Sequence, residues 1–444
     1  MLPHLSRHLR LSNTGVRPLR LASRRCFTLL GLESSADDTC AAVVTSEGRI
    51  LSNVVVKQNQ ELAIYGGIHP YAAIQRHQQN MPGAIRQALD DAGLDMSSID
   101  GIAYTRGPGI GGCLSVCSTA AKTLGATLNK PIFGVHHMQA HALTPLIPTL
   151  YAAHRTFTSA ADAEQPQTPP QFPFLALLIS GGHTLLLLAR SPDEFTTLAT
   201  TPDISIGNAF DHVARYLGLA PGERGYGAAL EAFAAGAPAS FTHGVDADVH
   251  DADEPDADAA VPDFAVPLRG QLAFSYGGPR SRVEIFVRER GGVERVPEAT
   301  RRALARAFQA AAVRQLEEKT VLALRHCEGL GVRVQDVVVS GGVASNSYLR
   351  QRLRAGLNEA FPGTALNLVY PPPHLCTDNA VMVAWAGMHR FAAGDFDTYD
   401  ASIRPKWRID EYTGKALARL HWLKLQRGLL AGLSTPTNAM GSSS

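Results

Sequence analysis

The stretch IFGVHHMQAHAL, residues 132–143, decides how we interpret this sequence. A short apolar run ends at Val135, and His136, His137 and His141 follow at once. If the chain becomes helical here, His137 and His141 lie one turn apart on the same face, where two imidazoles can bind one metal ion. Two histidines at this spacing also occur by chance, and helix capping or burial in a core is the plainer explanation. The architecture around the pair therefore has to decide.

A metal site of this kind needs a third ligand, and the candidate is Asp378 in the stretch HLCTDNA. Two neutral imidazoles and a carboxylate leave coordination positions open, which is typical of a catalytic site rather than a closed structural site. We expect His136 to pack beside the site rather than to bind the ion.

Length and composition indicate a globular protein large enough for two ordinary domains. The 444 residues are 45% hydrophobic and 18% charged. No run of about 18 apolar residues predicts a transmembrane helix, so we expect no membrane association. The six cysteines are scattered without a CxxC pair, which argues against a zinc ribbon or a disulfide framework and indicates a reducing compartment.

The first 32 residues carry six arginines and no acidic residue. This arginine-rich, leucine-dotted composition is typical of a mitochondrial or plastid transit peptide, and a basic arm that contacts nucleic acid is the alternative. Removal of the six positive charges takes the net charge from +1 to −5. The remaining protein is then not a generally basic nucleic-acid binder, and any RNA contact needs a local patch.

One order of elements occurs twice along the chain: a hairpin, a helix, a strand, a glycine loop, a helix, a strand and a helix. We expect strands at 27–32, 40–45, 102–105 and 132–135 with helices at 82–92 and 114–128, then strands at 174–180, 185–189, 337–339 and 366–370 with helices at 300–324, 348–357 and 376–387. The histidine pair and Asp378 occupy corresponding places in the two halves. This layout predicts an α/β fold of two duplicated actin-like, sugar-kinase-like ATPase (ASKHA) lobes that face a central nucleotide cleft.

Glycine turns follow strands in both halves, at 107–112 (GPGIGG), 181–184 (GGHT) and 341–346 (GGVASN). Backbone N–H groups in such turns bind anions, so we expect the ligand in the cleft to carry phosphate.

The expected domain boundaries follow the repeat and its interruptions. They are a transit peptide at 1–27, an N-terminal lobe at 28–150, a linker or insert at 151–172, a C-terminal lobe at 173–410 and a C-terminal helix and tail at 411–444. An acidic insert at about 241–263 interrupts the second lobe, and its stretch 246–258 holds seven acids and no basic residue. We expect a disordered surface loop there, because the stretch lacks the glycine and terminal glutamate of an EF-hand calcium loop.

Six motifs in this order resemble the tRNA N6-adenosine threonylcarbamoyltransferase family, earlier described as O-sialoglycoprotein endopeptidases. They are GLESSADDTCAAVV, TRGPGIGGCLSV, GVHHMQAH, LLISGGHT, SGGVASNSYLR and PPPHLCTDNAVMVAWAG, and the resemblance runs from about Leu29 to Arg408, interrupted only by the inserts. The resemblance implies transfer of a threonylcarbamoyl group from threonylcarbamoyl-AMP, supplied by a separate synthase, to N6 of the adenosine just 3′ of the anticodon in tRNAs that read codons beginning with A.

With its arginine-rich leader, the chain is similar to the mitochondrial branch of the family. This implies a homodimer in the mitochondrial matrix that binds the anticodon stem-loop of tRNA. His69 and His77, in an expected loop at 66–79 rich in Gly, His and Gln, are candidates to line the path of the tRNA, and ordinary polarity of an exposed loop is the plainer alternative.

Carried onto this chain, the resemblance implies one divalent cation per subunit (Fe, Zn or Mg) on His137, His141 and Asp378. The residues that would hold the adenylate are Ile179, Ser180, Gly181, Gly182, His183, Asp211, Gly227, Glu231, Ser345, Asn346 and Thr377. For Ser345 and Asn346, a helix N-cap is the structural alternative.

We add the hypothesis that Asp37, in the acidic turn ESSADDT at 33–39, accepts the proton of the amine. Ordinary turn formation by Asp37 and Asp38 is the alternative.

The chain departs from the family pattern at three places: Asn208 replaces an acid, Tyr226–Gly227 with Ala228 replaces the paired glycines of PGGP, and Pro279–Arg280 alters the motif FSFSGLK. Arginine in place of lysine keeps the charge but changes the donor geometry.

Three other functions compete with the transferase. A metallopeptidase of the glycoprotease type would carry a glutamate directly after the first histidine of HExxH, where this chain has Met138. An ASKHA small-molecule kinase would not need the histidine pair. A nucleotide-sensing partner protein without catalysis would not need the complete set of metal ligands.

Overall fold

The computed structural model describes residues 26–58, 68–153, 168–222, 224–238 and 261–411. The expected transit peptide, most of the expected linker, the acidic stretch 246–258 and the expected C-terminal tail lie outside the described residues. Within the described part of the chain, no helix is both long and apolar enough to cross a membrane.

Two five-stranded sheets repeat the same strand order. The first contains β1 (Thr28–Glu33), β2 (Thr39–Thr45), β3 (Ile50–Val56), β4 (Gly101–Gly107) and β5 (Ile132–His136), in the order β3-β2-β1-β4-β5. The second contains β6 (Phe174–Ile179), β7 (Thr184–Ser191), β8 (Glu194–Thr200), β9 (Asp336–Ser340) and β10 (Asn367–Val369), in the equivalent order β8-β7-β6-β9-β10. In each sheet the first three strands are antiparallel and the last two run parallel to the first. The duplicated α/β fold predicted from the sequence is therefore confirmed.

The helices fill the connections between these strands. They are α2 (Pro70–Ala92), α3 (Gly111–Leu128), α4 (His137–Leu143), α5 (Thr149–Ala153), α6 (Ile206–Tyr216), α7 (Tyr226–Ala234), α8 (Gly277–Glu289), α9 (Glu298–Gly329), α10 (Ser347–Ala360), α11 (Pro373–Cys376) and α12 (Ala380–Ala393). Short 3-10 turns lie at Met96–Ser98, Thr144–Leu146, Val293–Arg295, Gly342–Ser345 and Ile409–Glu411.

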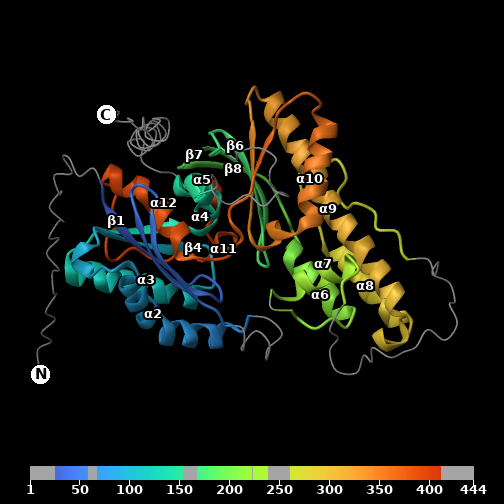
Figure 1. Cartoon of the computed structure of the whole chain (residues 1–444), viewed down its shortest axis with the longest axis horizontal. Helices are drawn as coiled ribbons and strands as arrows, with labels where there is room; N and C mark the ends of the chain where they lie inside the picture. Colours follow the sequence, from blue (N-terminus) through green and yellow to red (C-terminus); the bar gives the residue numbers. More distant parts are fainter. Residues whose placement is uncertain (1–25, 59–67, 154–167, 223, 239–260, 412–444) are drawn as a thin grey trace, which may run out of the picture.

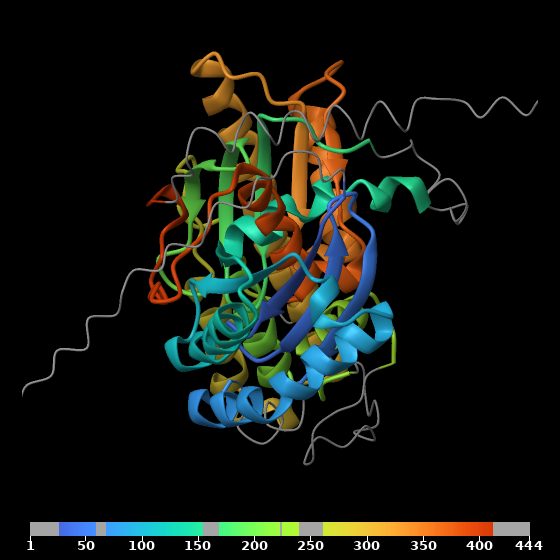
Figure 2. The ribbon, with the colours of Figure 1, turned by 90° about the vertical axis from the view of Figure 1, so that its left-hand side faces the viewer.

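Alternate residues of the central strands point to different helical layers, as the pleat of a strand requires. In β1, Leu30 and Leu32 pack with α2 and α3, whereas Leu29 packs with α12. In β6, Leu175 and Leu177 face the helices of the second lobe. Ala176 between them, like Leu178, packs in the core that includes α4 and α12. Helices α4 and α12 therefore form a layer between the two sheets, with α2 and α3 outside the first sheet and α9 and α10 side by side outside the second (Figures 1 and 2).

The first helix begins twelve residues before the predicted helix at 82–92, so the predicted loop at 66–79 is wrong for the residues that α2 covers. Pro70 stands at the first helical position, where its missing N–H costs nothing, and the Nδ1 of His69 accepts the N–H of Ala72 as an N-cap. Buried Ala73, His77 and Met81 follow at helical spacing and pack on the sheet. Because of this packing, the helix continues past Pro82, the residue at which the sequence predicts it to begin.

Gly31 in β1 allows α12 to approach the first sheet closely. A Cβ atom at this position would lie 2.2 Å from the carbonyl oxygen of Ala380 and 2.9 Å from the N of Ala384. Both atoms belong to the backbone of α12, so neither can rotate away. Ala380 begins α12 only two residues after Asp378. The close packing of Gly31 on the start of α12 therefore also fixes the position of Asp378.

We predict that Gly31→Ala destabilises the protein by at least about 1–3 kcal/mol, because the methyl group overpacks two rigid elements. The matched control is Gly83→Ala in α2, where a Cβ atom would meet nothing within 4 Å. That change should stabilise the helix by about 0.5–1 kcal/mol. Urea unfolding followed by circular dichroism measures both, and a Gly31→Ala protein as stable as the wild type would contradict the packing described here.

Candidate metal centre

The end of β5 sets the position of the histidine pair. His136 is the N-cap of α4: its Nδ1 accepts the N–H of Met138, and its Nε2–H donates to the carbonyl of Trp407 at 3.1 Å. Both ring nitrogens of His136 are therefore engaged, which agrees with the expectation that it packs beside the site. Helix α4 begins at His137 and is buried along its whole length, so its side chains point into the protein interior.

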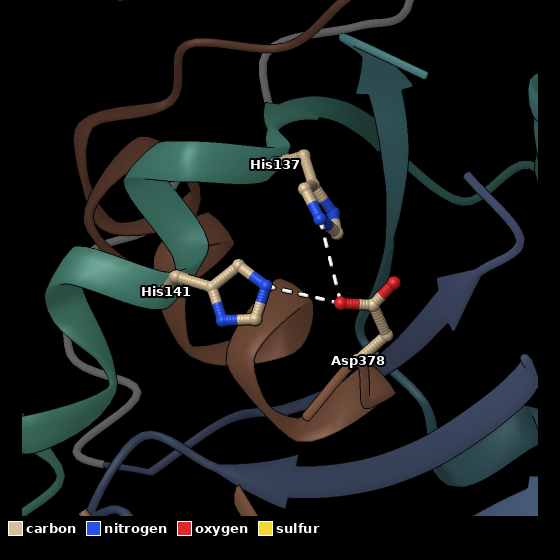
Figure 3. Close-up of side chains that lie close together, drawn as sticks. All are labelled: His137, His141 and Asp378. Atoms are coloured by element: carbon tan, nitrogen blue, oxygen red, sulfur yellow. Dashed lines mark hydrogen bonds and ion pairs between the residues drawn. The ribbon is translucent and has the colours of Figure 1, made fainter. Parts of the chain in front are cut away.

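The three residues singled out in the sequence come together in space (Figure 3). The Nε2 atom of His141 lies 3.1 Å from Oδ1 of Asp378, and the Nε2 atom of His137 lies 3.5 Å from the same oxygen. One ligand atom from each residue falls within 4.8 Å of the others. Two imidazoles and one carboxylate at this separation form a donor set that fits a single divalent cation.

A fourth side chain, Glu33 at the end of β1, lies against the histidines and was missed as a site residue by the sequence analysis. Its buried carboxylate accepts a hydrogen bond from Nδ1 of His137 at 3.1 Å and others from the hydroxyl of Thr105 and the N–H of Ser35. His137 therefore lies between two carboxylates, with Glu33 on one ring nitrogen and Asp378 on the other.

These carboxylates decide the charge of His137. Burial lowers the pKa of His137, but the negative charges of Asp378 and Glu33 outweigh it and raise the pKa to about 9. Burial raises the pKa values of Glu33 and Asp378, yet the positive charge of His137 holds both below their usual range. Without a cation, the positive charge of the His137 imidazolium balances the negative charges of Glu33 and Asp378, as the charge of a metal ion would.

The acidic turn between β1 and β2 adds two more carboxylates. Burial and the charge of Asp378 raise the pKa of Asp37 to about 6, and burial together with Asp37 raises the pKa of Asp38 to about 8. His77 fixes this turn, because its Nε2–H donates to the carbonyl of Ala36 and its Nδ1 accepts the hydroxyl of Thr39 at 2.7 Å.

The prediction that His77 lines the path of the tRNA is therefore wrong: the side chain is fully buried. His69 is exposed and serves as the N-cap of α2.

The turn between β6 and β7 faces the histidines. The Oγ of Ser180 accepts the backbone N–H groups of Gly182 and His183. The ring of His183 lies 6.2 Å from that of His137, and burial, aided by the charge of His137, lowers the pKa of His183 to about 4. His183 is therefore neutral at physiological pH and can act as a hydrogen-bond partner without adding charge.

The glycine loop after β9 packs directly on this turn. Gly341 has a φ of +102°, and a Cβ atom there would lie 2.2 Å from the carbonyl oxygen of Ile179. The side chain of Ile179 is buried in the core, so only its backbone borders the loop. Ser345 and Thr377 are exposed nearby, and the carbonyl of Thr377 accepts the side-chain amide of Asn379 at 2.8 Å.

The remaining candidates for nucleotide binding connect α6, α7 and α10. Burial raises the pKa of Asp211, against the opposing influence of the charge of Arg215 and the backbone of Gly227. The carboxylate of Glu231 accepts both the N–H and the hydroxyl of Ser347 at 2.7 Å. Asn346 is buried and caps α10 by accepting the N–H of Leu349, so the structural alternative expected for this residue is realised.

All three departures from the family pattern lie on helices of the second lobe: Asn208 on α6, Tyr226–Gly227 with Ala228 at the start of α7, and Pro279–Arg280 on α8. Asn208 is exposed in the first turn of α6, where its N–H donates to the N-cap hydroxyl of Ser205. The guanidinium of Arg280 lies 3.6 Å from the carboxylate of Glu284 and contacts the ring face of Tyr216.

Comparison with known proteins gives one consistent result. A family model described as "TsaD: tRNA N6-adenosine threonylcarbamoyltransferase" matches residues 49–385. A protein of Arabidopsis thaliana named "Probable tRNA N6-adenosine threonylcarbamoyltransferase, mitochondrial" is 35% identical over 420 residues, which cover 90% of this chain and 78% of that protein. A tRNA N6-adenosine threonylcarbamoyltransferase of Cereibacter sphaeroides is 39% identical over 396 residues, 87% of this chain and 95% of that protein. Among solved structures, the ROK hexokinase of Thermus thermophilus is 17% identical, with a TM-score of 0.36 over 81% of this chain and 97% of that chain.

We predict that cation binding at this centre releases at least one proton at pH 7, because His137 has a pKa of about 9 without a metal and must lose its Nε2 proton to bind one, while the cation also favours ionisation of Asp38. The affinity should therefore rise with pH, by about tenfold per pH unit below pH 9. Calorimetric titration with Co²⁺ in buffers of different ionisation enthalpy measures the proton count. An affinity independent of pH between 6.5 and 8.5 would show that His137 is not a ligand.

Proposed function

This chain belongs to the tRNA N6-adenosine threonylcarbamoyltransferase family, and from that premise we propose how its own residues carry out the transfer. The reaction moves the threonylcarbamoyl group from threonylcarbamoyl-AMP to N6 of the adenosine just 3′ of the anticodon in tRNA. The convergence of His137, His141 and Asp378 supports this function more than any other single observation.

The similarity to the mitochondrial protein of Arabidopsis thaliana supports the mitochondrial branch and a mitochondrial location. We propose the matrix as the compartment, a separate synthase as the source of threonylcarbamoyl-AMP, the anticodon stem-loop as the part of the tRNA that is bound, and a homodimer as the working form.

His137, His141 and Asp378 would hold one divalent cation per subunit. When bound, the cation would stabilise negative charge that develops on the carbamoyl and phosphate oxygens. Two histidines and one carboxylate suit Fe or Zn, whereas Mg usually takes an all-oxygen shell that keeps several waters. We therefore propose Fe or Zn as the resident ion.

The adenine amine is a poor nucleophile because its lone pair is delocalised into the ring, so the transfer needs a base for its proton. Asp37 is the better of the two carboxylates in the acidic turn. With a pKa of about 6, it is ionised at the pH of the cell and still basic enough to accept a proton, whereas Asp38, with a pKa of about 8, is mostly protonated.

The turn and loop that border the centre would hold the adenylate. We propose that backbone N–H groups at Gly181 and in the loop 341–346 bind the phosphate, with Gly182 beside them in the turn that the Oγ of Ser180 holds. Asp211, Gly227 and Glu231 would bind the nucleoside, with Ser345, Asn346 and Thr377 beside it. Fixing the adenylate in this way makes attack by the amine effectively intramolecular.

We predict that His141→Ala lowers product formation by at least about two orders of magnitude, because transition-state charge loses its stabilising cation. The assay combines the purified protein, a threonylcarbamoyl-AMP-generating synthase and unmodified tRNA, and detects the modified nucleoside by mass spectrometry. His326→Ala is the matched control, because His326 is exposed in the last turn of α9. Undiminished product from a folded His141→Ala protein would remove the metal mechanism.

A second prediction concerns the base. The single-turnover rate should rise with pH to a plateau, with an inflection at or below about pH 6, since a bound cation lowers the pKa of Asp37 further. Asp37→Asn should abolish this inflection and lower the plateau by about 10²-fold or more. Rapid-quench kinetics from pH 5 to pH 8.5 measure both effects. A larger loss for Asp38→Asn than for Asp37→Asn would assign the base to the neighbouring carboxylate.

A further inference from the structure

We propose that Glu33 is a positioning residue that fixes the ring and the tautomer of His137, so that metal affinity depends on a carboxylate that does not contact the metal. The inference rests on the metal centre of the proposed function and assigns it a residue outside the set of ligands.

The position of Glu33 excludes a role at the surface. It is the last residue of β1, and its side chain is completely buried. A buried carboxylate is costly unless its oxygens receive hydrogen bonds. Those of Glu33 come from His137 on α4, Thr105 on β4 and the backbone of Ser35. Three separate segments of the first lobe therefore hold this carboxylate in place.

The hydrogen bond between Glu33 and His137 determines which ring nitrogen faces the metal. An ionised carboxylate only accepts, so Nδ1 of His137 has to carry the proton that it donates over 3.1 Å. In the neutral ring, Nε2 then has the free lone pair. Nε2 is the atom that lies 3.5 Å from the carboxylate of Asp378. The carboxylate of Glu33 thus selects the tautomer that can bind a cation and also increases the basicity of the ring.

The pattern of donors requires a carboxylate rather than an amide at position 33. His137 and Thr105 both donate to Oε2, and the N–H of Ser35 donates to Oε1. A glutamine has one acceptor oxygen and one amino group, so its amino group would face a donor in either orientation. Glu33→Gln therefore weakens the hydrogen bond that orients the ring of His137, while it keeps the size of the side chain.

Ser35 offers a competing explanation, because its Oγ also lies 3.3 Å from Nδ1 of His137. A hydroxyl both donates and accepts, so it leaves both tautomers of the ring available. Only the carboxylate imposes one tautomer, and this difference can be measured.

The test is a titration of the full-length protein with Co²⁺, followed by its visible d–d absorption. Glu33→Gln should raise the dissociation constant by about 10–100-fold and shift the absorption bands, because the His137 ring is no longer held. Ser35→Ala and Thr105→Val are the matched controls, and each should change the dissociation constant by less than about tenfold. Circular dichroism and thermal unfolding establish that each variant is folded, so a merely structural effect would lower stability without altering the Co²⁺ spectrum.

Three outcomes overturn the inference. A folded Glu33→Gln protein with unchanged affinity and spectrum excludes it while leaving the transferase intact. A loss for Ser35→Ala as large as that for Glu33→Gln transfers the role to the serine. Failure of the wild type to bind Co²⁺ overturns the metal centre itself, and with it the proposed mechanism.

If Glu33→Gln does not fold, the tautomer of His137 can be measured in the wild-type protein instead. Histidine labelled with ¹⁵N in the Zn²⁺-loaded protein should show His137 protonated at Nδ1 only. Protonation at Nε2 instead would contradict the proposal.

Discussion

The packing of α4 and α12 between the two sheets determines the geometry of the metal centre. Both helices contact the same turn of the second lobe: Gln139, between the two histidine ligands on α4, donates to the carbonyl of Pro192 at 2.8 Å, and His389 on α12 pairs with Asp193 at 2.7 Å. Gly31 lets α12 approach β1 from the other side. The ligands are thus positioned by a close-packed interior in which shifts of even one methylene are resisted, rather than by surface loops. A catalytic cation needs this rigidity, because its ligands have to stay in place while the substrate changes charge.

The same packing concentrates negative charge around one imidazole, and the individual pKa shifts show how the protein balances it. Glu33 and Asp378 contact His137 and remain ionised. Asp37 and Asp38 face these carboxylates without an equivalent cationic partner, and their pKa values are raised. A divalent cation would supply the missing positive charge and lower the pKa values of all nearby acids. The excess of acid groups is therefore consistent with a site built to hold a metal.

The sequence predicted the parts of this arrangement that depend on local pattern. Alternating strands, glycine turns and the HxxxH spacing are local features. Aligning the two halves of the duplication then placed Asp378 at the position that corresponds to the histidine pair. Glu33 was missed because its role depends on His137, 104 residues away, and on Thr105, 72 residues away. His77 was taken for a loop residue because polar Gln and His neighbours hid its helical spacing, and Pro82 resembled a helix start. Only tertiary packing reveals that the ring of His77 supports the turn that carries Asp37.

The duplication also explains how the mixed donors of the candidate metal centre come together. Strands β5 and β10 occupy equivalent positions in the two sheets, and the histidine pair follows the first while Asp378 follows the second. Helix α4 follows β5, and α12 follows β10 after the short α11; both lie in the layer between the sheets. Residues that follow these two strands therefore meet, even though 237 positions separate His141 from Asp378. The two repeats differ in what they contribute at equivalent places: one supplies two imidazoles and the other a carboxylate, on the same arrangement of strands. The candidate metal centre thus lies where the two halves of the fold meet.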